Sequence, residues 1–101
     1  MIFELRHYIP IPGKAEAVIR RFKNHTFKIF DRRGFKVRDF WVEANDSGHL
    51  WYVLEWPSSE QMESEWDKFR SDAEWQSAKA ESEKDGPIVE RIDVVVLNRL
   101  A

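Results

Sequence analysis

Five consecutive apolar residues, Leu50-Trp51-Tyr52-Val53-Leu54, constrain the fold of this chain more than any other feature. A run of this length that is apolar at every position is typical of a strand buried on both faces, because strand side chains alternate between the faces of a sheet. The preceding Asn45-Asp46-Ser47-Gly48 cluster favours a turn, which predicts a hairpin with a strand over 37–42. That strand carries the adjacent pair Phe40 and Trp41, which must point to opposite faces. We therefore expect a sheet that is covered on both sides.

The remaining elements follow from hydrophobic periodicity and from the residues that interrupt it. Alternating apolar and polar residues indicate a strand, whereas apolar residues at intervals of three and four indicate an amphipathic helix. Proline and glycine mark the ends of these segments, and Ser58 and Asp72 are suited to begin helices. The predicted elements are strands over 2–8, 37–42, 50–54 and 92–97, a helix over 14–33 followed by Gly34, and a second helical region that begins at Ser58 and restarts at Asp72.

This β-α-β-β-α-β order predicts an α+β, ferredoxin-like fold, in which a four-stranded antiparallel sheet carries both helices on one face. The other face stays bare, although the strands over 50–54 and 92–97 place apolar side chains on both faces. A chain of 101 residues suffices for one domain but leaves no residues for a third layer. We therefore expect a single domain over 1–101 whose bare sheet face pairs with that of a second copy, forming a homodimeric α/β barrel.

Composition excludes several classes of function. Cysteine is absent, which rules out disulfides and thiol catalysis, and a net charge of −2 argues against nucleic acid as a partner. The N-terminus lacks the pattern of a signal peptide and no apolar stretch is long enough to cross a membrane, so we expect a cytoplasmic protein without a membrane partner. Phosphate-binding loops and the sequence motifs of serine hydrolases and zinc proteases are missing as well.

The first strand offers a row of side chains with chemical potential. If Phe3 and Leu5 face the helices, then Glu4, Arg6 and Tyr8 face the lumen of the barrel. Arg6 could then bind an acidic or carbonyl ligand, with Glu4 or Tyr8 handling a proton. The competing interpretation is an Arg–Glu pair that serves only to stabilise the sheet.

Neighbouring strands extend this candidate site. A register that directs Leu50 and Tyr52 to the helices directs Trp51 and Glu55 to the lumen, where Trp41 would join them. The reverse register would exchange the helix-facing and lumen-facing residues of this strand. The tryptophan rings would form the walls of a small-molecule pocket, or they would simply fill the core of the dimer.

The three histidines give weaker indications. His25 lies beside the apolar stripe of the first helix, where a packed or surface histidine is the ordinary interpretation and a residue at a pocket mouth is the functional one. His7, His25 and His49 are separated by 18 and 24 residues, spacings that match no local metal-binding motif. We therefore predict neither a metal site nor a cofactor.

Several short motifs occur in the same order as in a known family. They are Glu4-Leu5-Arg6-x-Tyr8, Pro12-Gly13-Lys14, Gly34-Phe35 leading to Phe40-Trp41, the strand before Trp56-x-Ser58, and Asp72-x-Glu74-Trp75-Gln76. Together they cover nearly the whole chain, which resembles the NIPSNAP family. One departure is Met62, which stands where we expect an arginine typical of the family's second helix.

The resemblance implies a dimeric α/β barrel of unassigned activity, in a broader group that includes cofactor-free oxygenases, lactone isomerases, haem-degrading enzymes and stress-induced proteins. Fold alone does not choose among them. Two hypotheses follow. The protein binds or converts a small organic molecule in the lumen, as a cofactor-free oxygenase or isomerase would, or it is a non-enzymatic dimeric module for protein interaction or stress.

Overall fold

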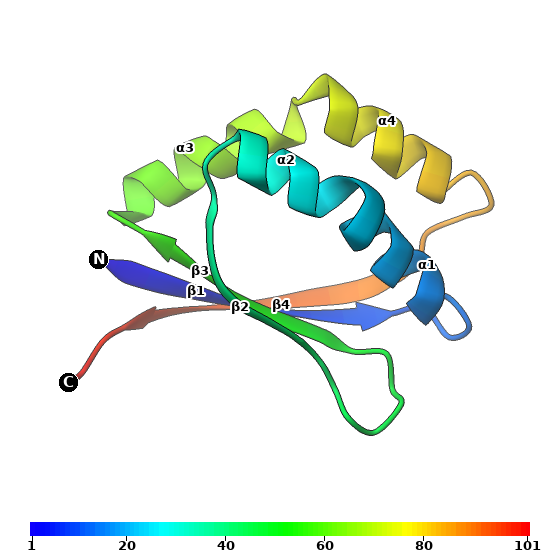
Figure 1. The fold of residues 1–101 in the computed structure, drawn as a ribbon, viewed down its shortest axis with the longest axis horizontal. Coiled ribbons are helices and arrows are strands. Elements are labelled where there is room, and N and C mark those ends of the chain that lie inside the picture. The colour runs from blue at the N-terminus through cyan, green and yellow to red at the C-terminus, as the bar shows by residue number, and fades with distance from the viewer.

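A four-stranded antiparallel sheet forms one layer of the molecule, and helices cover one of its faces (Figure 1). The computed structural model describes residues 1–101. Its strands are β1 (Ile2–Pro10), β2 (Lys36–Val42), β3 (Leu50–Trp56) and β4 (Val89–Asn98), in the spatial order β2-β3-β1-β4. The predicted ferredoxin-like α+β fold is therefore confirmed for the single chain.

The predicted first helix is a continuous helical segment that contains an irregular turn. It consists of α1 (Ala15–Arg21), a π-helical turn η1 (Phe22–Thr26) and α2 (Phe27–Arg32). The hydroxyl of Thr26 donates to the backbone oxygen of Arg21, five residues earlier, inside this turn. Gly34 follows with φ of +75°, the left-handed conformation expected after a helix.

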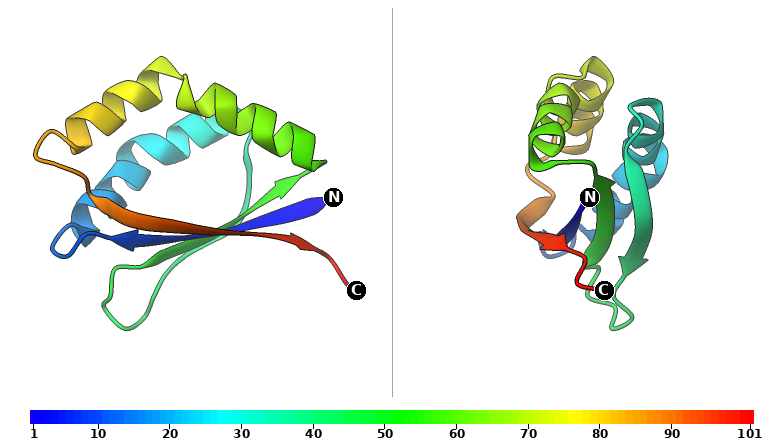
Figure 2. Two further views of the ribbon diagram at one scale, coloured as in Figure 1. Left: turned by 180° about the vertical axis from the view of Figure 1, so that it is seen from behind. Right: turned by 90° about the vertical axis from the view of Figure 1, so that its left-hand side faces the viewer.

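The second helical region is divided as predicted into α3 (Ser59–Arg70) and α4 (Ala73–Ser82). Each helix begins at a capping side chain: Ser58 Oγ accepts from the backbone N–H of Gln61, and Asp72 Oδ1 accepts from that of Trp75. Figure 2 shows that both helical segments lie on the same side of the sheet.

The core lies between the helices and that face of the sheet. Val18, Ile29, Tyr52 and Leu54 are fully inaccessible to solvent, and an aromatic cluster fills much of the remaining volume. The side chains of β3 alternate as expected. Leu50, Tyr52, Leu54 and Trp56 are buried against the helices, while Trp51, Val53 and Glu55 are only half-buried on the other face.

The predicted orientation of β1 is wrong. Glu4 lies opposite Leu54 and Arg6 opposite Tyr52, and residues directly opposite in an antiparallel pair share a face. Glu4, Arg6 and Tyr8 therefore point toward the helices, not toward a barrel lumen, whereas Phe3, Leu5 and His7 point away from them. A buried carboxylate is tolerated on the core face because the indole N–H groups of two tryptophans bind it.

The opposite sheet face is open in the single chain. Trp41 is 48% exposed, and Val95 and Leu97 of β4 are similarly accessible beside the half-buried Leu5. The apolar run of β3 is consequently buried on one face only, and coverage of the second face remains a prediction. No helix of this chain has the length and apolar character needed to span a membrane.

Candidate functional site

A cleft of about 440 Å³ opens between the helices and the β1–β4 side of the sheet. It lies on the helix-covered face, so it is separate from the predicted barrel lumen. Strands β1 and β4 form its floor, and helices α1, α3 and α4 supply its walls. Its principal lining residues are Arg6, Tyr8, Arg21, Trp66, Trp75 and Ile92.

Arg6 is held at the floor of the cleft by a network on three sides. Its Nη1 donates to Glu4 Oε2 at 2.9 Å, and its guanidinium lies 4.2 Å from the ring centre of Trp66. The other oxygen of Glu4, Oε1, accepts from the indole N–H groups of Trp56 at 2.9 Å and Trp66 at 2.8 Å. The carboxylate thus fixes both the arginine and the tryptophan on which the arginine stacks.

A second buried arginine reaches the cleft from α1. Arg21 is 6% exposed, and its Nη1 donates to Ser82 Oγ at 3.1 Å and Glu83 Oε2 at 3.0 Å. Its guanidinium lies 5.0 Å from the ring centre of Trp75, which repeats the pairing of arginine with tryptophan seen at Arg6.

Positive charge exceeds negative charge along the cleft. Five of its lining side chains are basic and two are acidic. The Nε atoms of Arg6 and Arg21 are both buried without a hydrogen-bond partner. A buried guanidinium with unmet hydrogen-bonding capacity is destabilised, and a nearby anion offsets part of that cost. The cleft is therefore suited to an acidic ligand.

Two tyrosines continue the network away from the cleft. Arg6 Nη2 donates to the hydroxyl of Tyr8 at 3.2 Å, and that hydroxyl lies 2.9 Å from the hydroxyl of Tyr52. Burial, reinforced by the neighbouring Tyr8, raises the pKa of Tyr52 well above its ordinary value. Tyr52 is consequently a neutral phenol near pH 7, and a hydrogen-bonded path leads from it through Tyr8 to the cleft.

The structure separates the predicted lumen residues into two groups. Glu4, Arg6 and Tyr8 interact directly with one another, as expected, but on the helix side. Trp41 and Trp51 lie opposite each other on the open face, and Glu55 shares that face. The sheet therefore stands between the two groups, and no single pocket contains both.

His25 has an exposed position on the π-helical turn and lines a neighbouring hollow of about 330 Å³. This hollow shares Arg21 with the cleft, but His25 does not line the cleft itself. Met62 packs against the core from α3, where an arginine was expected.

Three cleft residues were missed as functional candidates. Trp66 and Trp75 lie beside arginines through tertiary packing, which no local pattern of the sequence reveals. Arg21 belongs to a helical segment whose other basic side chains are mostly exposed. Its position three residues after Val18, on the apolar stripe, was the signal that could have identified it as buried.

The fold defines a class: small α+β proteins in which a four-stranded ferredoxin-like sheet carries its helices on one face. The NIPSNAP family model matches residues 3–101, and the chain belongs to this family. A search of curated proteins finds no match.

Solved structures show the same fold at low sequence identity. An uncharacterized NIPSNAP domain protein from Burkholderia xenovorans has a TM-score of 0.82 at 16% identity, over 100% of this chain and 96% of that one. A NIPSNAP family protein from Agrobacterium tumefaciens has a TM-score of 0.82 at 15% identity, over 96% and 90% of the two chains. An antibiotic biosynthesis monooxygenase has a TM-score of 0.68 at 15% identity, over the full length of both. At these identities the likeness concerns the fold alone.

Proposed function

We propose that this protein binds a small organic acid in the cleft between its helices and its sheet. The carrying observation is the excess of basic over acidic side chains along the cleft, together with the unpartnered Nε atoms of its two buried arginines, Arg6 and Arg21. The carboxylate of the ligand would lie near these guanidinium groups, and its apolar part would pack against Trp66 and Trp75. Aromatic walls with a few convergent polar groups are typical of small-molecule sites.

The Arg6–Tyr8–Tyr52 network supports conversion of the ligand as well as binding. Tyr8 lines the cleft, and its hydroxyl is hydrogen-bonded to that of the fully buried Tyr52. It is placed to donate a proton to a carbonyl or enolate oxygen of the ligand, with Tyr52 stabilising the phenolate that remains. Such a step suits an isomerase or a cofactor-free oxygenase, and the fold shared with an antibiotic biosynthesis monooxygenase is compatible with this class.

Matched pairs of small molecules test the binding proposal. Aromatic and aliphatic carboxylates are titrated into the protein by calorimetry, and each is compared with the neutral primary amide of the same skeleton. We expect the carboxylate of at least one pair to bind roughly tenfold or more tightly, which corresponds to about 1.4 kcal/mol of binding free energy. Equal affinity of acids and amides throughout the set would overturn the proposal.

We also propose that the open sheet face joins two copies of the chain. Trp41, Val95 and Leu97 are large apolar side chains that are exposed on this face, and neighbouring exposed apolar side chains are typical of an interaction surface. The alternative function, a non-enzymatic dimeric interaction module, depends on this face alone. It predicts a dimer without any preference of the cleft for acids, so the titrations above distinguish the two functions.

A further inference from the structure

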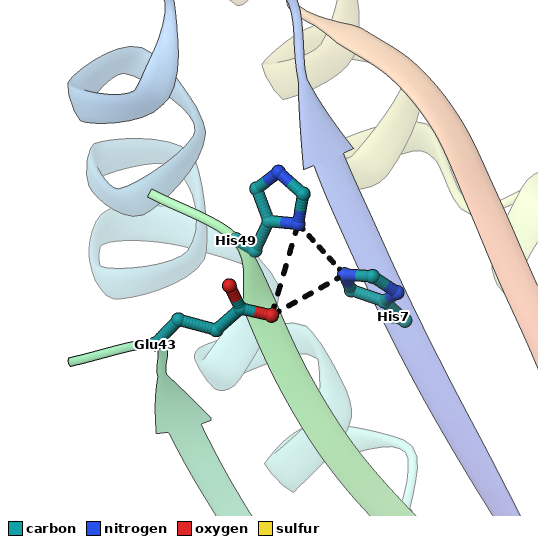
Figure 3. A group of neighbouring side chains, drawn as sticks. All are labelled: His7, Glu43 and His49. Carbon is teal, nitrogen blue, oxygen red and sulfur yellow. Dashed lines mark hydrogen bonds and ion pairs between the residues drawn. The ribbon is translucent and has the colours of Figure 1, made fainter. Parts of the chain in front are cut away.

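Three potential metal ligands converge on the open face of the sheet, on the opposite side from the cleft. His7 lies in β1, Glu43 follows β2, and His49 precedes β3 (Figure 3). His7 Nε2 and His49 Nδ1 are 2.9 Å apart, and Glu43 Oε2 lies 3.7 Å from the former and 3.8 Å from the latter. The same three atoms define all three distances, so the ligands form a compact triangle.

Strand pairing brings these residues together from distant positions in the sequence. His7 lies opposite Trp51 in the β1–β3 ladder, which places it beside the start of β3. The backbone N–H of Glu43 donates to the carbonyl of His49 at 2.9 Å, closing the β2–β3 hairpin. A search for local metal-binding spacings therefore misses this cluster, because its geometry arises from the sheet.

Surrounding side chains hold the ligands in place. Glu43 Oε2 accepts from the indole N–H of Trp51 at 2.7 Å, and Oε1 accepts from Ser47 Oγ at 2.9 Å. The indole of Trp51 also stacks on the imidazole of His7, with ring centres 3.8 Å apart and planes inclined by 9°.

A further carboxylate stands behind the histidine. Asp93 Oδ2 lies 3.9 Å from His7 Nδ1, the ring nitrogen that faces away from the cluster. This separation is longer than a hydrogen bond, so Asp93 acts on His7 only through its charge.

The triangle has the dimensions of a small transition-metal site. The point equidistant from the three atoms lies in their plane, about 2.0 Å from each, which is close to the usual bond length from zinc to imidazole nitrogen or carboxylate oxygen. A tetrahedral ion lies out of this plane, so its binding requires small shifts of the three side chains. Without an ion, His7 Nε2 and His49 Nδ1 form a hydrogen bond, in which one of the two nitrogens carries the proton and the other accepts it. Two imidazoles with one carboxylate favour zinc and its neighbours over Mg²⁺ or Ca²⁺, which prefer oxygen ligands.

We propose that His7, Glu43 and His49 bind one divalent transition-metal ion per chain, with Zn²⁺ the ion that fits best. Three protein ligands leave a position of a tetrahedral ion open to water or to an acidic or carbonyl ligand. All three side chains are only partly buried in the single chain, and two of them flank the β2–β3 turn at the end of the sheet.

Titration of the untagged full chain with Zn²⁺ near pH 7.5 tests the proposal, with Mg²⁺ as the comparison ion. We expect one Zn²⁺ per chain and no binding of Mg²⁺. His49→Ala should abolish the binding, while Trp51→Phe, which removes the donor to Glu43 but keeps an aromatic ring, should weaken it roughly 10- to 100-fold. His25→Ala is the matched control, because His25 is exposed and outside the cluster; its affinity should equal that of the unmodified chain.

Diffraction data collected at the zinc absorption edge from crystals soaked in Zn²⁺ provide a second readout. A peak enclosed by the three ligand atoms supports the site. No binding of Zn²⁺, one ion per two chains, or an equal loss of affinity in His25→Ala and His49→Ala would each overturn it. Circular dichroism of every variant shows whether a lost signal reflects loss of a ligand or loss of the fold. The carboxylate titrations address the other sheet face, so failure of either proposal leaves the other testable.

Discussion

The indole N–H of Trp66 donates to Glu4 Oε1 at 2.8 Å and thereby connects helix α3 to the central strand β1. The same carboxylate binds Trp56 and Arg6, so one buried acidic side chain has three donors around it. Polar groups buried in this way stabilise a fold only while all partners are present. This network determines the orientation of Arg6 in the cleft, and it provides the first prediction.

Glu4→Ala should destabilise the protein strongly. The substitution leaves the buried guanidinium of Arg6 and two indole N–H groups without their acceptor, and removing one partner of a buried ion pair typically costs about 3–5 kcal/mol of unfolding free energy. Urea denaturation followed by circular dichroism measures this quantity. Glu81→Ala, which removes an exposed carboxylate from α4, should change it by less than about 1 kcal/mol. Similar losses in the two variants would contradict the role assigned to Glu4.

Arg6→Lys should weaken the binding of an acidic ligand more than it weakens the fold. Lysine keeps the positive charge but lacks the planar fork that reaches both Glu4 and Tyr8. We expect a roughly tenfold or greater loss of carboxylate affinity, measured by the same calorimetric titration. Arg38→Lys is the control, since Arg38 lies on β2 and is absent from the cleft lining. An unchanged affinity in Arg6→Lys would remove Arg6 from the proposed site.

Val95→Glu should separate the proposed dimer into single chains. Val95 lies opposite Leu5 on the open face, whereas its neighbour Val94 lies opposite Arg6 on the helix face. The two valines are 48% and 46% exposed, so glutamate is accommodated equally at either position of an isolated chain. Light scattering after size-exclusion chromatography gives the molecular mass. We expect a monomer for Val95→Glu and a dimer for Val94→Glu, and the same mass for both variants would contradict the proposed interface.

The stability of the protein should decline in acid through Asp72. Burial alone would raise the pKa of this carboxyl group, but hydrogen bonds from Arg32, the backbone N–H of Trp75 and Arg33 lower it from 3.8 to about 2. A group with a lowered pKa contributes stability above the pKa of the unfolded chain and loses it as the pH falls through the folded value. The contribution of Asp72 is therefore complete above about pH 5 and declines between about pH 4 and pH 2.

Asp72→Asn isolates this effect, because asparagine can still cap α4 but carries no charge for Arg32 and Arg33. Its unfolding free energy should lie below that of the unmodified protein at pH 7 and approach it near pH 2. Urea denaturation at several pH values measures the difference. A deficit that stays constant across the range would show that the ion pairs do not account for it. Asp72→Ala should cost about 1 kcal/mol more than Asp72→Asn through loss of the cap.

The sequence predicts elements and their order well because periodicity and capping are local properties. Ser58 and Asp72 cap helices as expected, and Phe40 packs on the helix side of its strand. The orientation of β1 was wrong because Phe3 and Leu5 are apolar and were assigned to the core, although the open face is also apolar. Glu4 occupies the core only because Trp56 and Trp66 approach it, and those contacts span 52 and 62 positions.

The residues of the cleft and the proposed metal ligands are both brought together by tertiary structure. Arg6 and Tyr8 were identified by their residue types, but the cleft that they line is created by helices packed across the sheet. His7 and His49 were considered separately because they are 42 positions apart in the sequence. An antiparallel ladder brings such residues within hydrogen-bond distance, and no spacing rule for local motifs detects it.

The π-helical turn between α1 and α2 also constrains how the length of this segment can vary. Such a turn accommodates one residue more than a regular α-helix does. Successive residues of an α-helix are rotated by about 100° around its axis. In a regular helix, deletion of one residue would therefore turn the side chains of Ile29 and Phe30 away from the sheet. With the turn present, a one-residue deletion within Phe22–Thr26 can be absorbed by regular helix, and both side chains keep their places in the core. The turn is therefore the position at which helix length can differ between homologues without altering the core.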